Sequence, residues 1–324
     1  MTISTKAGLV IALAVALMLY PLVFSGAFYL NVGATILLAA ISASAWNLVG
    51  GYAGQISVGH GMFFGVGAYV PLLVYQHWKI PPLAGVPAAL GLSVVLAAVI
   101  GLPAFRLRGH YFSMATIAVA ELIRIFVGTW DYVGAAMGLQ GPAVGRQWWD
   151  LTFRDERPYY YIFLGVLAVL LYVTFEMQRS RFGSYLRAIK ADERAAASLG
   201  VSVQRTKLLS LILSAIFTSV AGSLYSIKTG FIDPESGFGI LVSVQMVIFA
   251  ALGGAGTLFG PLLGAVILVT LQTATNTWLG GGGSGLTYIL YGGIIVLLAR
   301  YEPGGLHEFW HRLARRFRRG RHAA

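Results

Sequence analysis

One short motif near the C-terminus has the spacing of a catalytic metal site. His307 and His311 are four residues apart with Glu308 between them, the H-E-x-x-H pattern in which two histidines bind zinc and the glutamate acts as a base. A catalytic zinc also needs a third protein ligand and a substrate cleft. The motif is instead followed by RLARRFRRGRH, whose positive charge opposes a bound cation. We therefore favour a basic amphipathic helix on anionic lipid over a zinc-dependent hydrolase.

An acid–base pair lies inside an apolar segment. Glu121 and Arg124 are three residues apart, so they share one face of a helix. An unpaired charge inside a membrane-spanning helix is costly, so we expect an ion pair that faces the bundle interior or a subunit contact. A direct role in a translocation path is the alternative. Glu121 is also the only acidic residue well inside a predicted span, which gives little support to a stand-alone ion-coupled carrier.

Two glycine-rich stretches supply further candidates for a path. Residues 50–69 read GGYAGQISVGHGMFFGVGAY and residues 253–265 read GGAGTLFGPLLGA. Glycines four residues apart let helices pack closely, and glycine-rich breaks at corresponding places in two halves of a chain are typical of re-entrant helices in transporters. Both interpretations stay open, as does a purely structural hydrogen-bonded histidine. The candidates, with one glutamine outside the two stretches, are Gln55, Ser57, His60, Gly61, Gly65, Gln245, Gly256 and Gly260.

The elements that must position these residues are membrane spans. Of 324 residues, 57% are hydrophobic and 11% charged, against about 25% charged residues in a soluble domain. Residues 7–78 and 236–299 contain no Asp, Glu, Lys or Arg. There is no cysteine, which excludes disulfides and thiolate metal sites. We predict an all-α polytopic transmembrane bundle of about eight to ten spans, in which the glycine-rich stretches form either re-entrant helices or close helix contacts.

Proline, glycine and charge divide the chain into candidate spans. The first is expected to remain as a span, a cleaved signal peptide being the alternative. Residues 1–300 would form the transmembrane domain and residues 301–324 a basic cytoplasmic tail. The candidate spans are 8–24, 27–49, 57–75, 82–105, 110–130, 158–177, 207–228, 239–256, 261–279 and 285–300.

Charge predicts the orientation of the spans. Segment 178–207 and the tail from residue 300 each hold seven basic residues against two acidic ones, whereas segment 131–157 holds three against four. Basic loops stay in the cytoplasm, so both termini are predicted to be cytoplasmic. The net charge of +11 therefore reflects membrane orientation and gives no reason to expect a nucleic-acid partner.

Segment 178–207 contains KADERAAASLGVSVQRTK, a basic stretch between two apolar blocks. The pattern predicts one amphipathic helix capped by Ser184 and ended by Gly200, with a second start at Ser202. Small residues at 195–197 would let a partner surface approach closely. A solvated linker on the lipid surface is the alternative. The apolar face of this helix would comprise Leu186, Ile189, Ala196 and Leu199.

These stretches resemble a known family. ADERAAASLGVSVQRTKLLSLILSAIFTSVAGSLYS at 191–226, GYAGQISVGHGMFFGVGAY at 51–69, ELIRIF at 121–126 and GFIDPESGFGILVSVQMVIFAALGGAGTLFGPLLGA at 230–265 are similar to the M-type permeases of bacterial ABC importers for branched-chain amino acids. The broader importer signature places Glu-Ala-Ala six residues before a glycine. Here Glu193 precedes Gly200 by seven residues and is followed by Arg194.

The resemblance implies a permease in a bacterial inner membrane that works with a second permease, two cytoplasmic ATPases and an extracytoplasmic solute-binding protein. It implies that the basic helix docks on an ATPase. It leaves open urea, short amides or another small solute as cargo. No G-x-x-x-x-G-K-[ST] motif occurs in the chain, so we expect ATP and magnesium on the partner subunits and no cofactor on this one. The expected coupling residues are Arg187, Lys190, Glu193, Ala195, Ala196 and Gly200.

Overall fold

A computed structural model describes residues 15–107, 109–143, 148–278, 289, 292 and 293. The predicted tail with its H-E-x-x-H motif lies outside the described residues, as do nearly all of the predicted span 285–300 and the first half of the span 8–24.

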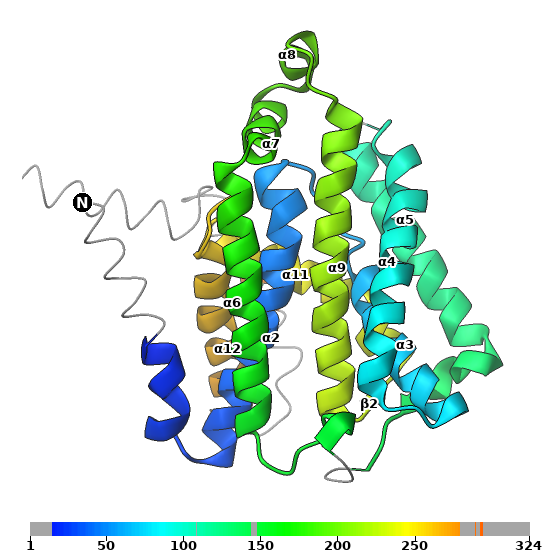
Figure 1. The fold of residues 1–324 in the computed structure, drawn as a ribbon, viewed down its shortest axis with the longest axis vertical. Coiled ribbons are helices and arrows are strands. Elements are labelled where there is room, and N and C mark those ends of the chain that lie inside the picture. Colours follow the sequence, from blue (N-terminus) through cyan, green and yellow to red (C-terminus); the bar gives the residue numbers. More distant parts are fainter. Residues whose placement is uncertain (1–14, 108, 144–147, 279–288, 290–291, 294–324) are drawn as a thin grey trace, which may run out of the picture.

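The described residues form a bundle of long helices, with one short antiparallel strand pair at one end (Figure 1). Eight of the ten candidate spans coincide with helices, and six of these are long and apolar enough to cross a membrane. The predicted polytopic all-α fold is confirmed. The elements are α2 (Ala27–Asn47), η1 (Leu48–Tyr52), α3 (Gly61–Trp78), α4 (Pro82–Ala104), α5 (His110–Thr129), η2 (Asp131–Val133), η3 (Ala135–Met137), β1 (Leu139–Gln140), η4 (Trp148–Asp150), α6 (Arg157–Arg179), α7 (Arg181–Ala191), α8 (Glu193–Ser198), α9 (Val203–Thr229), β2 (Phe231–Ile232), α10 (Pro234–Phe238), α11 (Ile240–Gly253) and α12 (Gly260–Trp278).

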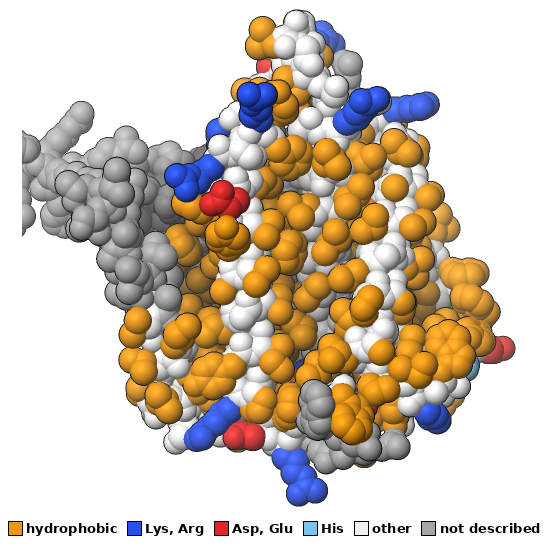
Figure 2. Space-filling view, viewed as in Figure 1, with side chains coloured by type: hydrophobic (Ala, Val, Ile, Leu, Met, Phe, Trp, Pro, Cys, Tyr) orange, Lys and Arg blue, Asp and Glu red, His pale blue; other side chains and the backbone are white. Residues whose placement is uncertain are grey.

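The two ends of the bundle differ. Helices α6 and α9 reach the same end, where α7 and α8 connect them, and β2 lies at the opposite end (Figure 1). We call the first the α7–α8 end. Lysine and arginine side chains gather around it, and the flank of the bundle between the two ends is mostly apolar (Figure 2). The structure thus places the basic segment 178–207 and strand β1 of the acidic segment 131–157 at opposite ends.

Non-helical backbone enters the bundle after η1. Residues 53–60 contain no helix, and α3 begins inside the bundle behind α9 (Figure 1). Backbone at this depth needs internal hydrogen-bond partners because lipid offers none. The amide of Val58 donates to Thr116 Oγ1 at 3.2 Å, and Ser113 Oγ donates to the carbonyl of Ile56 at 2.5 Å. Helix α5 therefore stabilises this re-entrant loop.

A second interruption faces the first. The chain leaves α9 at Gly230, passes through β2 and α10, and starts α11 after Gly239. The beginnings of α3 and α11 meet, because the amide of Gly61 donates to Ser243 Oγ at 2.7 Å. The first glycine stretch thus contains an interruption, in agreement with one of its two interpretations. The second stretch, 253–265, is instead the turn between α11 and α12, so the counterpart interruption is at 230–239.

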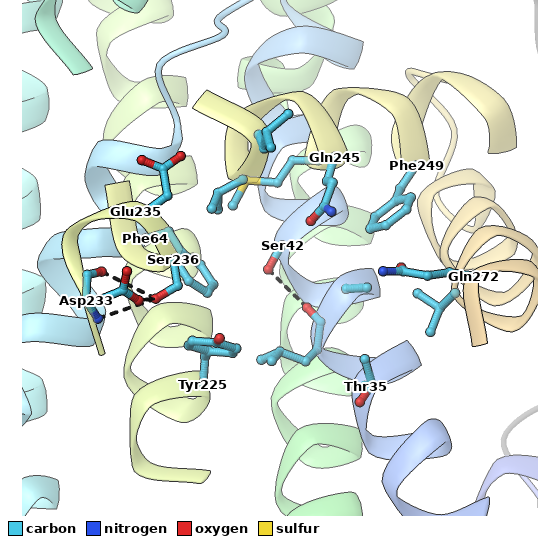
Figure 3. A pocket seen from close by; sticks show the side chains of 16 residues that line it. Thr35, Ser42, Phe64, Tyr225, Asp233, Glu235, Ser236, Gln245, Phe249 and Gln272 are labelled. Atoms are coloured by element: carbon cyan, nitrogen blue, oxygen red, sulfur yellow. Dashed lines mark hydrogen bonds between the residues drawn. The ribbon is translucent and has the colours of Figure 1, made fainter. Parts of the chain in front are cut away.

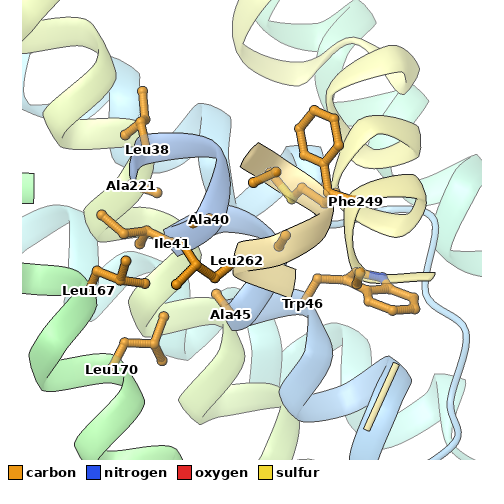
Figure 4. Close-up of a cluster of buried hydrophobic side chains, with 14 of the residues drawn as sticks. Leu38, Ala40, Ile41, Ala45, Trp46, Leu167, Leu170, Ala221, Phe249 and Leu262 are labelled. Atoms are coloured by element: carbon orange, nitrogen blue, oxygen red, sulfur yellow. The ribbon is translucent and has the colours of Figure 1, made fainter. Parts of the chain in front are cut away.

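A core of apolar side chains fixes the arrangement of α2, α6, α9, α11 and α12 (Figure 4). Helix α2 is almost entirely buried along its second half because helices surround it on several sides. Its alanines leave room for larger neighbours. The side chains shown include Leu38, Ala40, Ile41, Ala45 and Trp46 of α2, packed with Leu167, Leu170, Ala221, Phe249 and Leu262.

Glycines bring α3 and α9 into backbone contact. A Cβ at Gly222 would lie 2.0 Å from the carbonyl oxygen of Phe64, and a Cβ at Gly67 would lie 2.0 Å from that of Ser219. Ser223 Oγ also donates to the carbonyl of Gly67 at 2.8 Å. Small residues and interhelical hydrogen bonds of this kind hold membrane helices together.

Replacing Gly222 by alanine is expected to lower the free energy of unfolding by about 2–3 kcal/mol, since the new methyl group meets backbone that cannot yield without separating the helices. Thermal unfolding of the purified protein in detergent measures this. The matched control is Gly165→Ala in α6, where a Cβ would meet no atom within 4 Å. The control should be neutral or stabilising by up to about 1 kcal/mol. Equal effects of the two substitutions would contradict the close contact.

Candidate functional site

The segment joining α6 and α9 is two helices at an angle, so the prediction of one helix from Ser184 to Gly200 is wrong. Ser180 caps the first, accepting a hydrogen bond from the amide of Gly183 at 3.3 Å. The chain is extended at Asp192, whose carboxylate accepts from the amides of Arg194 at 2.7 Å and Ala195 at 3.0 Å. These hydrogen bonds lower the pKa of Asp192 and start α8 in a new direction.

Helix α8 ends as the sequence predicts. Gly200 has a φ of +83°, in the left-handed region, and its amide donates to Ala197 while that of Val201 donates to Ala196. This pair of hydrogen bonds is a Schellman motif, which glycine permits without strain. Ser202 then directly precedes α9, as predicted.

The break at Asp192 divides the predicted apolar face. Leu186 and Ile189 are buried beneath α7, and Ala196 is 2% exposed beneath α8, whereas Leu199 is 84% exposed. Helix α8 protrudes farthest from the bundle (Figure 1). Leu199 therefore presents an apolar side chain at the α7–α8 end. A larger residue at Ala196 would disturb packing within the chain, so a substitution at this expected coupling residue cannot test docking.

Helix α7 is tied to the ends of α2 and α11. Lys190 Nζ donates to the carbonyl of Gly51 at 2.7 Å. Asn47 Oδ1 accepts from the amide of Gly256 at 2.7 Å, and its Nδ2 donates to the carbonyl of Thr257 at 2.9 Å. The two glycine stretches therefore meet here, and a Cβ at Gly256 would lie 3.1 Å from Lys190 Nζ. We call these contacts the Lys190 anchor.

Helix α8 has its own internal anchor. Glu193 Oε1 accepts from Gln55 Nε2 at 3.0 Å and from Lys207 Nζ of α9. The side chain of Lys207 is only 2% exposed and that of Glu193 is 38% exposed. Lys207 Nζ also lies 6.0 Å from the centre of the Phe105 ring. We call this the Glu193 anchor, and it links α8 directly to the re-entrant loop.

Ser57 and His60 form a buried network. His60 Nε2 lies 2.8 Å from Ser214 Oγ, and Nδ1 lies 2.9 Å from Ser57 Oγ. Ser214 donates its hydroxyl hydrogen to the carbonyl of Ala45 at 2.6 Å, so it accepts from Nε2 and leaves Nδ1 to accept from Ser57. Both ring nitrogens have partners and neither side chain is exposed. This geometry fits a structural histidine better than a residue of an open path.

A cavity of about 470 Å³ opens between α2, α9, α10, α11 and α12. Asp233 and Glu235 lie on one side and Gln272 and Phe249 on the other, with Gln245 above Ser42 of α2 between them (Figure 3). Of the predicted path residues, Gln245 is the one that lines this cavity. Gln55 lines a second cavity of about 640 Å³ beneath α8. Gly65 packs against Phe238, and Gly260 against Gly253.

The predicted pair of Glu121 and Arg124 forms, with a third member. Arg124 Nε and Nη2 donate to the two oxygens of Glu121 at 2.9 and 2.5 Å, and Nη1 donates to Glu235 of α10 at 3.2 Å. Both side chains of the pair remain partly exposed on α5, at 42% and 30%. The pair therefore lies on the flank of the bundle. It does not face the bundle interior, which was one of the two expected locations.

The sequence matches a family model described as "Branched-chain amino acid transport system / permease component" over residues 25–299. This chain belongs to the branched-chain amino acid transport permease family. Six helices among its described residues are long and apolar enough to cross a membrane, so this family member is a multi-pass membrane protein.

Individual relatives agree with the family. The chain is 30% identical over 289 residues to "High-affinity branched-chain amino acid transport system permease protein LivM" of Escherichia coli K12, an alignment of 80% of this chain and 65% of that protein. It is 25% identical over 268 residues to LivH of the same strain, covering 77% and 84%. The chain thus spans 65% of the length of the LivM relatives it matches. A solved structure, "PsaBC from Streptococcus pneumoniae in complex with Fab", shares 16% identity with a TM-score of 0.45.

Sequence reasoning missed three residues of this permease. Lys207 belongs to the basic segment 178–207, and its pairing with Glu193, 14 positions earlier in another helix, leaves no periodic signal in the sequence. Asn47 is an isolated polar residue in an apolar run, so its sequence context gives no indication of a partner. Leu199 falls on the predicted apolar face, and only the break at Asp192 turns it to solvent. Arg187, as predicted, is exposed and bonds only its own segment, at Gln178 and Ser184.

Proposed function

We propose that this chain is the transmembrane permease subunit of an ATP-driven importer that translocates branched-chain amino acids delivered by a solute-binding protein. The family match over residues 25–299 carries the proposal. In this proposal the α7–α8 end faces the cytoplasm of a bacterium, both termini are cytoplasmic, and the membrane is the inner membrane. The chain itself catalyses no reaction and binds no cofactor.

The α7–α8 pair supplies the mechanism. It protrudes from an apolar bundle, presents Leu199 to solvent and is fastened to the transmembrane part by the Lys190 and Glu193 anchors. Two cytoplasmic ATPases would bind ATP and magnesium and push on this pair as they close. The anchors would pass the movement to the re-entrant loop 53–60 and to the turn at Gly256. Rigid-body shifts of this kind can switch a path between its two openings.

The flank of α5 supports a second permease subunit as partner. Helix α5 packs sparsely on its own chain and exposes large apolar side chains together with the Glu121–Arg124 pair. Charges exposed to lipid are costly, so burial of this flank against a second, similar permease would stabilise it.

Reconstitution tests the function. Proteoliposomes containing this chain, a partner permease and two ATPases should accumulate leucine, isoleucine or valine under two conditions together. ATP must be present on the side of the membrane that carries the ATPases, and the loaded binding protein must be present on the opposite side. This chain alone should accumulate none. Accumulation by the chain alone under an ion gradient would identify a carrier instead, and uptake of urea or a short amide without leucine would select the alternative cargo.

A further inference from the structure

The cavity between α2, α9, α10, α11 and α12 has a size and a lining suited to one small molecule. Its volume of about 470 Å³ falls within the range of about 300–1,000 Å³ typical of small-molecule sites. The acidic side chains Asp233 and Glu235 lie on one side, and Phe249 lies on the other together with the amide of Gln272 (Figure 3). The residue types on the two sides therefore indicate what kind of molecule fits.

The charged side of the cavity is acidic. Asp233 and Glu235 line it, and no lysine, arginine or histidine does so among the described residues. The neighbouring Arg124 donates from both Nε and Nη2 to Glu121. Glu235 accepts a single hydrogen bond from Nη1 of Arg124, at 3.2 Å. Two carboxylates thus share one guanidinium, and Asp233 adds a further negative charge to the cavity lining, so the net charge on this side is negative. Such a potential concentrates cations.

The hydroxyl groups of α2 add hydrogen-bond acceptors. Ser42 Oγ donates its hydrogen to the carbonyl of Leu38 at 3.0 Å, and Thr35 Oγ1 donates to that of Asn31 at 2.8 Å. Both oxygens therefore offer lone pairs to the cavity, not hydrogens. The lining consequently favours a ligand group that carries several N–H donors.

The remaining wall is apolar. Leu38, Met246, Phe249 and Val269 line it. A branched aliphatic group buries well against such side chains, whereas urea, which is polar on every side, gains nothing from them. Gln245 lies between the two sides and its amide can donate to a carboxylate (Figure 3).

We propose that this cavity is a solute site, in which the Asp233–Glu235 side binds a primary ammonium group and the Phe249 side binds a branched aliphatic group. The assignment rests on the proposed function and places one contact point of the transported amino acid within this chain. Recognition is through the ammonium and the side chain more than through the carboxylate, because no cationic residue lines the site.

The absence of cysteine from the chain allows a direct test. In purified full-length protein, Val242→Cys places a thiol on the cavity wall. Its rates of modification by a cationic and an anionic methanethiosulfonate are compared, each relative to the same reagent on a small free thiol. The cationic reagent should react about tenfold faster, and adding Glu235→Gln should reduce that preference. Thr35→Cys repeats the test from α2 if the first variant does not fold.

Protection by small molecules identifies the ligand groups. Millimolar L-leucine and 3-methylbutylamine, which share an ammonium and a branched chain, should slow modification of Val242→Cys several-fold. Urea, and 4-methylpentanoate, which lacks the ammonium, should not. Ser184→Cys, exposed on α7, is the control and should show no protection by any of them. Equal protection by 4-methylpentanoate, or a preference for the anionic reagent, would overturn the assignment.

The two proposals fail separately. If the reconstituted importer accumulates leucine but leucine does not protect Val242→Cys, the cavity assignment is wrong and the function stands. If leucine and 3-methylbutylamine protect the cysteine but the importer accumulates only another solute, the cavity assignment stands and the cargo is wrong.

Discussion

Replacing Glu193 by leucine is expected to destabilise the protein by about 3 kcal/mol, because a buried ion pair that loses one partner leaves an uncompensated charge. Lys207 is the buried member, at 2% exposed, and Glu193 is its carboxylate partner. Thermal unfolding in detergent should shift down by several degrees. Lys207→Met should cost much less, since the carboxylate of Glu193 is 38% exposed and can turn to water.

The double variant separates stability from coupling. Glu193→Leu with Lys207→Met removes both charges, so its stability should return close to that of the original protein. The hydrogen bond from Gln55 to Glu193 is still lost, and with it the link between α8 and the re-entrant loop. Without this link α8 no longer moves together with the loop, so uptake per ATP hydrolysed should stay about tenfold lower, which corresponds to about 1.4 kcal/mol of lost coupling free energy.

The outcome of the double variant decides what the Glu193 anchor does. Restored stability with fully restored uptake would show that the anchor only supports the fold. Failure of Lys207→Met to relieve the instability of Glu193→Leu would show that the buried lysine is not its source. Arg187→Met is the matched control, because this exposed arginine bonds only its own segment and should leave thermal stability unchanged.

Much of the fold was predictable because its determinants are local. Apolar runs bounded by proline, glycine and charge identify spans one at a time, and eight of them appear as helices. The predicted spans 207–228 and 239–256 also contain the break at 230–239, but they do not show that it meets the start of α3. That meeting depends on contacts between the two segments, with Ser243 bonding the start of α3 and Phe238 packing against Gly65. Contacts between helices far apart in sequence leave no periodic pattern in either segment.

The candidate site was predictable to a similar degree. The basic segment, its glycine stop and the ion pair of Glu121 and Arg124 follow from composition and spacing. The directions of individual side chains cannot be predicted from composition and spacing. The extended backbone at Asp192 turns α8, so its residues no longer continue the buried face of α7. Leu199 consequently points outward. Lys190, although exposed, donates to the carbonyl of Gly51 within its own chain, a contact that charge alone does not predict.

The largest functional loss is expected from Leu199→Asp. An apolar side chain that is 84% exposed at the tip of a protruding helix makes few contacts within its own chain, so the substitution should change thermal stability by less than about 0.5 kcal/mol. If the ATPase buries this leucine, a carboxylate in its place is desolvated without a partner. Loss of a central contact costs about 2 kcal/mol or more, so uptake should fall at least about thirtyfold.

Graded variants show whether the leucine acts by docking. Leu199→Met should keep most of the uptake, because it preserves the apolar contact, and Leu199→Ala should fall between methionine and aspartate. The matched control is Leu92→Ala near the middle of α4, a leucine that is 49% exposed outside both proposed interfaces and should leave ATPase binding unchanged. Co-purification of the ATPases with each variant measures docking directly. Unchanged co-purification and uptake with Leu199→Asp would remove α8 from the docking surface and leave the exposed face of α7, with Arg187, as the remaining contact.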